Sequence, residues 1–296
     1  GRAQDVVRHP RALMVIAVGR VGIGDEELSG RGLTARCRRV AAGAGVREGP
    51  SAELRGRVHF LDFPARGHEV VVRGVAVEGV EEEETVAEDG RVFVSGFDEQ
   101  VHVFAASGTK LASIGEPGTG PGQLTKPVDV AIGPAANLHV ADASNARIEV
   151  FTLDGQHQRT IGEPGEERGQ FRMPRAVEVD AEGRVYVGQG DDFLIQVFSS
   201  DGVYLQTFGD TRSNETIWRV GGIAADSMGR IYATQAMANR IHAHAPLPDL
   251  GLIWDMGSLG SGPEQFSTPL GMAFRNGKLY VADQQNNRIA VYRLAP

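Results

Sequence analysis

The chain has 296 residues, a formal net charge of −8 and a pI near 5.5. This acidic balance argues against the phosphate-binding surface that a nucleic-acid partner would require. The single cysteine, Cys37, excludes an internal disulfide and a thiolate metal cluster. The most apolar run, residues 13–18, is far too short to cross a membrane. We therefore expect neither a nucleic-acid partner nor a membrane span.

The N-terminal part begins with short candidate strands that follow no clear repeat. Residues 12–18 are predicted to form one strand, and a Gly-rich stretch follows it. Alternating apolar residues then predict strands at 58–62, 69–72 and 75–78. We place a further strand at 34–41, although three arginines stand in it.

From residue 85 onwards the chain repeats a single pattern. Copies begin at Pro127, Pro174, Val220 and Pro269, which are 47, 46 and 49 residues apart. The copy at Val220 is weaker than the other three, and one over 85–122 is weaker still. A fixed period of this size indicates supersecondary units that bury their faces only against their neighbours. The sequence therefore predicts one closed domain over residues 1–296.

The copy at 127–171 shows the plan of one unit. Alternating apolar residues predict four strands in it, which we letter a to d, at 128–132, 138–141, 147–151 and 157–161. Glycines fall where the chain reverses between a and b and between c and d, as tight antiparallel turns require. Four antiparallel strands per unit are typical of a propeller blade.

Two of these copies carry a family resemblance. The strings HVADASNARIEVF (139–151) and YVADQQNNRIAVY (280–292) resemble the NHL repeat, whose family builds six-bladed β-propellers. The resemblance implies an all-β fold of six four-stranded antiparallel blades. Counted in this way, the blades are 33–80, 83–122, 127–171, 174–210, 220–257 and 269–294. The last copy lacks a strand d, and we expect residues 12–18 to supply it, because closure removes an unpaired edge.

An aspartate and an arginine stand five residues apart across the b–c loop of both strings, as Asp142 with Arg147 and as Asp283 with Arg288. One interpretation is a ligand contact. The other is a clamp that holds the loop, and we favour it because the pair recurs with the repeat, whereas an active site occurs once.

The end of the propeller that carries the b–c and d–a loops is where we expect a partner to bind. Its residues mix acids, amides and exposed apolar side chains, a composition that suits a protein or peptide. The candidate residues are Phe97, Asp98, Glu99, Ser144, Asn145, Arg175, Asp191, Asp192, Phe193, Arg219, Met237, Asn239, Gln284 and Asn286.

We therefore predict a non-enzymatic protein- or peptide-binding or scaffold propeller, or an accessory subunit of a larger assembly, without a cofactor. The resemblance favours a bacterial protein in a periplasmic or secreted setting. The copies depart from one another most at Asp191–Phe193, at Met237 and in the N-terminal part, and these departures are where we expect function to lie.

The alternative is a metal-dependent lyase or lactone hydrolase with its site at the mouth of the central channel. The lyases that share this propeller fold typically hold zinc with a histidine directly after the proline that opens strand a. Val128, Arg175 and Leu270 stand at that place here, so we assign no catalytic residue and no metal ligand. The sequence does not decide whether a small molecule or a metal binds in the central channel. His242 and His244, two apart on one strand, are the best candidates for a pair of metal ligands.

Overall fold

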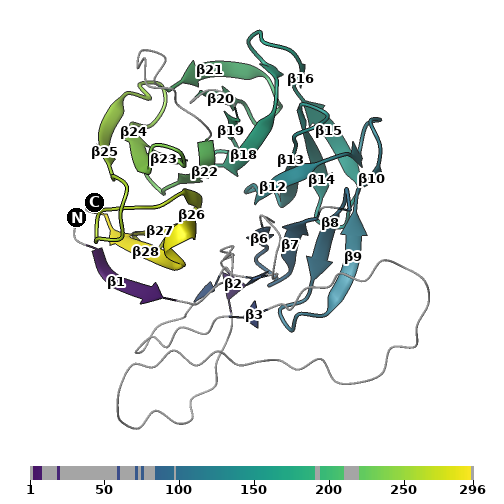
Figure 1. Ribbon diagram of the computed structural model, residues 1–296. Helices are drawn as coiled ribbons and strands as arrows, with labels where there is room; N and C mark the ends of the chain where they lie inside the picture. The colour runs from purple at the N-terminus through teal and green to yellow at the C-terminus, as the bar shows by residue number, and fades with distance from the viewer. Residues whose placement is uncertain are drawn as a thin grey trace.

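A computed structural model describes residues 3–8, 19–20, 59–60, 71–72, 75–76, 84–96, 98–190, 194–209 and 220–294. The predicted all-β propeller of four-stranded antiparallel blades is confirmed. Figure 1 shows the blades arranged around a centre, with one strand of each blade innermost. We number the blades first to fifth in chain order. No helix in the described ranges is long and apolar enough to cross a membrane.

Each blade is a meander whose strands are hydrogen-bonded in sequence order, with one exception in the fifth. The first blade contains β6 (Glu84–Val86), β7 (Val92–Ser95), β8 (Val101–Phe104) and β9 (Lys110–Ile114). The second contains β12 (Pro127–Ile132), β13 (Asn137–Asp142), β14 (Arg147–Thr152) and β15 (His157–Ile161). These four agree with the strands predicted at 128–132, 138–141, 147–151 and 157–161 to within one residue at each end.

The remaining blades follow the same plan. The third contains β18 (Pro174–Val179), β19 (Val185–Gln189), β20 (Ile195–Phe198) and β21 (Tyr204–Phe208). The fourth contains β22 (Val220–Ala225), β23 (Ile231–Gln235), β24 (Arg240–His244) and β25 (Leu252–Met256). The fifth contains β26 (Pro269–Arg275), β27 (Lys278–Asp283), a single 3₁₀ turn η1 (Gln284–Asn286) and β28 (Arg288–Arg293).

The chain's N-terminal strand completes the fifth blade, but it is not the strand we predicted. β1 (Ala3–Arg8) pairs antiparallel with β28, with Val6 opposite Ala290. The outer edge of β28 is thereby taken by 3–8 rather than by 12–18, and residues 12–18 lie outside the described residues. The N-terminal part does close the last blade, as expected, but a different segment does so: 3–8, AQDVVR, shows no apolar alternation that could have marked it as a strand.

The expectation of six blades is also wrong, because the described residues form five four-stranded sheets. Between 33 and 80 the described strands are only two residues long. There β3 (His59–Phe60) pairs with β5 (Val75–Ala76), and β4 (Val71–Val72) pairs with β2 (Gly19–Arg20), which is not the order of a meander. The predicted inner strand at 34–41 carries Arg36, Arg38 and Arg39, side chains that are seldom buried between two sheets.

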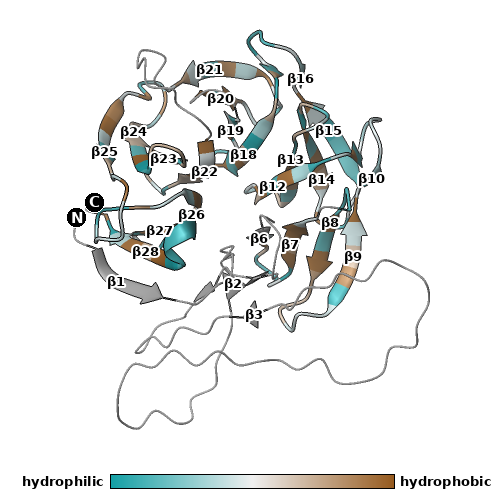
Figure 2. Cartoon of the chain, viewed as in Figure 1, coloured by the Kyte–Doolittle hydropathy of each residue, from teal (hydrophilic) through white to brown (hydrophobic). Residues whose placement is uncertain are grey.

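The hydrophobic core lies between blades rather than at one centre. Four clusters of buried side chains each join two neighbouring blades, from the first and second to the fourth and fifth. Between the second and third blades, for example, Ile148 and Val150 of β14 pack with Val185 and Val187 of β19. Figure 2 shows the contrast with the outer strand β15, which is largely hydrophilic. Because each core is shared, a blade's side chains are placed by its neighbours.

Two ends of the propeller follow from this plan. The b–c loops and the d–a loops lie at one end, which we call the loop face, and the a–b and c–d turns lie at the other, which we call the turn face. Two parallel two-residue ladders, β10–β11 (Glu116–Pro117 with Gln123–Leu124) and β16–β17 (Glu163–Pro164 with Gln170–Phe171), shape the d–a loops before the second and third blades.

Candidate functional site

The loop face of the second blade is held by a buried aspartate. The Asp142 side chain is fully buried. Its Oδ1 accepts hydrogen bonds from the backbone N–H of Thr125 at 3.1 Å and of Lys126 at 3.0 Å. Its Oδ2 accepts from Asn145 Nδ2 at 2.6 Å, and the same amide donates to the carbonyl of Gly118 at 2.9 Å. The aspartate and the amide therefore join the b–c loop to the preceding d–a loop.

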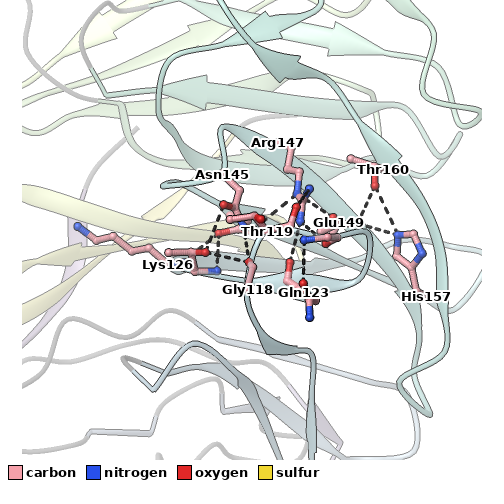
Figure 3. Close-up of polar contacts among 12 residues, drawn as sticks. Gly118, Thr119, Gln123, Lys126, Asn145, Arg147, Glu149, His157 and Thr160 are labelled. Atoms are coloured by element: carbon pink, nitrogen blue, oxygen red, sulfur yellow. Dashed lines mark hydrogen bonds and ion pairs between the residues drawn. The ribbon is translucent and has the colours of Figure 1, made fainter.

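Arg147 completes this clamp (Figure 3). Its guanidinium donates to three backbone carbonyls of the same d–a loop, those of Thr119 at 2.8 Å, Gly120 at 2.6 Å and Gln123 at 2.9 Å. Its Nε lies 2.8 Å from Oε1 of Glu149, so the cation is neutralised inside the loop. The arginine thus fills the space between the d–a loop and the blade.

Glu149 is the fully buried counter-ion of this clamp. Its Oε2 accepts from Thr160 Oγ1 at 2.9 Å and lies 2.7 Å from His157 Nε2 (Figure 3). A buried carboxylate is costly unless it is paired and hydrogen-bonded, and Glu149 has both kinds of partner. Arg147 and Glu149 therefore close the loop face of the second blade, joined by an ion pair rather than by a hydrogen bond between Nε and Oε1.

The fifth blade repeats the clamp. Arg288 Nε lies 2.7 Å from Asp283 Oδ2, and its Nη atoms donate to the carbonyls of Ser261 and Gly262 at 2.7 and 2.9 Å. Asn286 Nδ2 donates to Asp283 Oδ2 at 2.8 Å. The structural interpretation of the Asp–Arg pairs is confirmed. Two residues that we predicted to face a partner, Asn145 and Asn286, use their amides to hold these loops.

The third blade keeps the backbone plan and loses the charged clamp. Gln189, Leu194 and Gln196 stand where the second blade has Asp142, Arg147 and Glu149, 47 residues earlier. Gln189 Oε1 still accepts from the backbone N–H of Arg172 at 2.9 Å. Gln196 donates to the carbonyl of Gln170 at 2.7 Å and accepts from the N–H of Gly169 at 2.8 Å. Leu194 has no donor to offer the loop.

A cavity of about 470 Å³ opens at this place, and we call it the third-blade pocket. The carbonyl-bearing residues Glu166 and Glu167 of the d–a loop line it on one side, and Leu194 and Leu205 line it on others. Glu166 and Glu167 are the counterparts of Thr119 and Gly120, whose carbonyls accept hydrogen bonds from the Arg147 guanidinium. The pocket is therefore the space that the clamp arginine fills elsewhere.

The charges around the third-blade pocket are mixed. The Glu166 carboxylate lies 2.9 Å from Arg172, and their side chains are 71% and 49% exposed. Arg168 and Glu167 also line the pocket. An exposed pair of this kind is screened and weak, so it adds little to the chemistry of the site.

The other predicted residues are spread around the loop face. Asp98 and Ser144 are exposed, and Asp98 Oδ1 lies 2.9 Å from Nε2 of the buried His102. Met237 is 60% exposed, while Asn239 Oδ1 accepts from the N–H of Thr268 at 2.8 Å. The rest are partly buried: Glu99, Arg175 and Gln284. Phe97, Asp191, Asp192, Phe193 and Arg219 lie outside the described residues.

Only part of this site could be predicted from the sequence. The repeat shows Gln189 and Leu194 where the second blade has Asp142 and Arg147. Nothing in the pattern singles out Glu166, Glu167 or Leu205, because the pocket arises where a side chain is missing between two elements. His242 Nε2 lies 3.2 Å from Gln235 Oε1, and His244 Nδ1 lies 3.1 Å from the carbonyl of Leu250. Over the described ranges no three His, Cys, Asp or Glu side chains are grouped to hold a metal ion.

Comparisons with known proteins place the fold. No protein-family model and no curated protein sequence matches the chain. Similar solved structures include virginiamycin B lyase from Staphylococcus aureus, at 14% identity and a TM-score of 0.54 over 72% of this chain and 65% of that one. A streptogramin B lyase is similar at 16% identity and a TM-score of 0.53 over 70% and 63%. A chain of a nidogen/laminin complex is similar at 18% identity and a TM-score of 0.56 over 70% and 72%.

These likenesses concern the propeller fold alone, because the identities are low and a shared fold does not fix a function. The chain spans less than two thirds of the length of either lyase. The neighbours include both lyases and a member of a protein–protein complex, so the site must decide between these functions.

Proposed function

We propose that this chain is a non-enzymatic, NHL-type propeller that binds a protein or peptide on its loop face, with an arginine side chain of the partner in the third-blade pocket. We infer a bacterial, periplasmic or secreted setting from the repeat's resemblance to that family. The observation that carries the binding proposal is the pocket of about 470 Å³ at the third blade, where Leu194 stands in place of a clamp arginine.

The repeat itself supports an arginine as the occupant. In the second and fifth blades the same turn of the d–a loop binds a guanidinium through two neighbouring carbonyls, those of Thr119 and Gly120 and those of Ser261 and Gly262. A planar fork of N–H donors matches this arrangement, whereas an ammonium presents a point charge. The carboxylates of Glu166 and Glu167 at the rim add attraction for a cation, which Arg168 and Arg172 partly offset.

The rest of the loop face supports a macromolecular partner. The clamps hold the second and fifth loops in place before binding, which lowers the entropy that binding must overcome. Three apolar side chains are exposed on or beside this face: Leu205 at 47%, Met237 at 60% and Leu259 at 70%. Exposed apolar residues around a pocket are typical of protein-binding surfaces. In the nidogen/laminin complex a propeller of this fold takes part in a protein assembly.

A peptide-display selection tests the proposal. Wild-type protein should enrich arginine-containing peptides. The variant Gln189→Asp/Leu194→Arg installs the repeat's own clamp, closes the pocket and should bind the selected peptides at least about tenfold more weakly, a difference of ~1.4 kcal/mol. Gln285→Ala, at an exposed residue of the same face that is not among the candidate binding residues, is the matched control and should bind like wild type. Enriched peptides without arginine, or equal binding by the closed variant, would contradict the proposal.

A further inference from the structure

A second cavity lies at the opposite end of the propeller and does not depend on the proposed function. The third blade shows what fills the equivalent space elsewhere in the propeller. There Asp180 lies below the a–b turn. Its carboxylate accepts from Arg184 Nε at 2.6 Å, from Tyr186 Oη at 2.9 Å and from the backbone N–H of Glu182 at 3.1 Å. The turn face of this blade is closed by an aspartate, an arginine and a tyrosine.

The fourth blade has the same network. Asp226 accepts from Arg230 Nε at 2.6 Å and from Tyr232 Oη at 2.9 Å. Both tyrosines are fully buried between blades. The network is therefore a second recurrent clamp of this chain, and it fills the space under the turn.

The second blade lacks all three side chains. Gly133, Asn137 and His139 stand 47 residues before Asp180, Arg184 and Tyr186, in a turn with the same backbone hydrogen bonds. A Cβ built on Gly133 would lie 3.4 Å from Cε1 of His139 and 2.9 Å from Cγ1 of Val179. A side chain at position 133 would thus lie against both Val179 and the imidazole.

A cavity of about 270 Å³ opens under this turn, between the second and third blades, and we call it the turn-face cavity. His139 lines it and is 3% exposed. The backbone of Asn137 and of Ala131 lies near its ring, but among the described residues neither ring nitrogen makes a hydrogen bond of good geometry. Arg159 also lines it. Its Nη2 donates to the carbonyl of Ser200, and its buried Nε has no partner among the described residues.

We propose that the turn-face cavity binds a small monocarboxylate, whose carboxylate takes the place of the aspartate that Gly133 lacks. One oxygen accepts from Arg159 Nε–H and the other from the N–H of neutral His139. Such charge-assisted hydrogen bonds are the strong ones, and here they satisfy donors that are otherwise buried without partners. The site copies, with a free ligand, the arrangement that Asp180 makes with its own chain.

The lining sets the size of the acid. Pro134, Ala135 and Val179 offer an apolar wall for a short aliphatic chain. The volume lies just below the range of roughly 300–1,000 Å³ that is usual for drug-sized ligands, so the ligand is a short acid. Asp201, the acidic residue in the lining, opposes a second carboxylate and favours a monocarboxylate.

The experiment is a titration of the full chain, labelled with ¹⁵N at histidine, followed by NMR at constant ionic strength. Acetate and propionate should shift the His139 ring resonances to saturation. Acetamide, which has the same shape without the charge, and phosphate, which has charge without the planar carboxylate, should bind at least about tenfold more weakly.

Two variants separate the site from general charge effects. Arg159→Gln, which places the residue found at the equivalent position 206 in the third blade, should weaken propionate binding at least about tenfold. Arg91→Gln, at a turn-face arginine of the first blade that does not line the cavity, is the matched control and should leave binding unchanged. No saturable shift of His139, equal binding of acetamide, tighter binding of phosphate, or equal losses in the two variants would each overturn the proposal.

Discussion

The second and third blades are neighbours with the same strand plan, yet each is open at the end where the other is closed. The second blade is closed at the loop face by Asp142, Arg147 and Glu149 and is open at the turn face around His139. The third blade is closed at the turn face by the Asp180 network and is open at the loop face beside Leu194. The blade fold therefore tolerates the loss of either clamp, and each loss leaves a cavity in a known place.

This comparison separates what holds the propeller from what the propeller can bind. The shared cores between blades consist of apolar side chains and are present whether a clamp is complete or not. The clamps are polar, and a cavity with polar lining opens where one is missing. On the loop face this lining includes Glu166 and Glu167. On the turn face it includes His139 and Arg159. The ligands that we propose for the two cavities therefore differ in charge. The third-blade pocket would bind a cation, and the turn-face cavity would bind an anion.

The largest effect should come from breaking an intact clamp. Arg288→Ala leaves the fully buried carboxylate of Asp283 without its cation, and removing one partner of a buried pair costs about 3–5 kcal/mol. Arg172→Ala breaks the exposed pair of the open third blade and should cost less than about 1 kcal/mol. Urea unfolding of both variants measures the contrast. Equal losses would show that the clamps contribute no more than surface pairs.

The next effect concerns Asp129, which connects the two compared blades. Its Oδ2, on β12, accepts from the N–H of Val177 on β18 at 2.7 Å. Burial raises the pKa of Asp129 to about 7 despite its hydrogen bonds to the N–H groups of Val177 and Val130. The folded state therefore holds this proton more tightly than the unfolded state, whose aspartate titrates near pH 4. The free energy of unfolding from this group falls as pH rises from about 4 to about 7, by roughly 2–4 kcal/mol.

Asp129→Asn isolates that contribution. The amide cannot ionise, so the variant should gain stability relative to wild type as pH rises from about 5 to about 8, measured by urea midpoints at each pH. Parallel curves for Asp129→Asn and wild type would contradict the assignment of a raised pKa to this carboxyl.

A smaller effect is expected from closing the turn-face cavity. Gly133→Asp/Asn137→Arg/His139→Tyr installs the network of the third and fourth blades. The filled cavity and the added hydrogen bonds should offset the shift that the new Cβ, 2.9 Å from Val179 Cγ1, imposes, so the free energy of unfolding should rise by no more than about 1 kcal/mol. The variant should also lose the response to propionate. A marked loss of stability would show that the second blade cannot accept the geometry of its neighbours.

Replacing His139 alone, by His139→Tyr, should remove a pH dependence of stability. Burial and the nearby charge of Arg159 lower the pKa of His139 to about 4, below the 6.5 of a free histidine. The stability that this neutral histidine contributes is complete above pH 6.5 and is lost as pH falls towards 4. Wild type should therefore lose stability over that interval more steeply than His139→Tyr does, as thermal melts between pH 4 and 7 can show.

The sequence contained much of the fold and less of the sites. The repeat predicted the strands of the second blade to within a residue and identified the Asp–Arg pairs as structural. It failed where no copy exists to compare, in the six-blade count and in the choice of 12–18 over Ala3–Arg8. An edge strand pairs through its backbone, and Ala3–Arg8 has no apolar alternation, so the sequence pattern did not identify it.

The cavities were harder to predict for a different reason. Both depend on side chains that are absent between two elements brought together by the fold. The signal was present in the alignment of the copies, where His139 stands in place of Tyr186, Tyr232 and Tyr280. Its meaning depended on knowing that the tyrosine binds an aspartate under the turn, and only the structure supplies that contact.

The most direct test of the account is a double-mutant cycle on the third-blade pocket. Calorimetry would measure a selected arginine peptide and its leucine analogue, each against wild type and against Gln189→Asp/Leu194→Arg. The account predicts that replacing the peptide's arginine weakens binding to wild type at least about tenfold, or ~1.4 kcal/mol, and has no effect on binding to the closed variant. Equal losses on both proteins would show that the arginine binds elsewhere and would contradict the central claim.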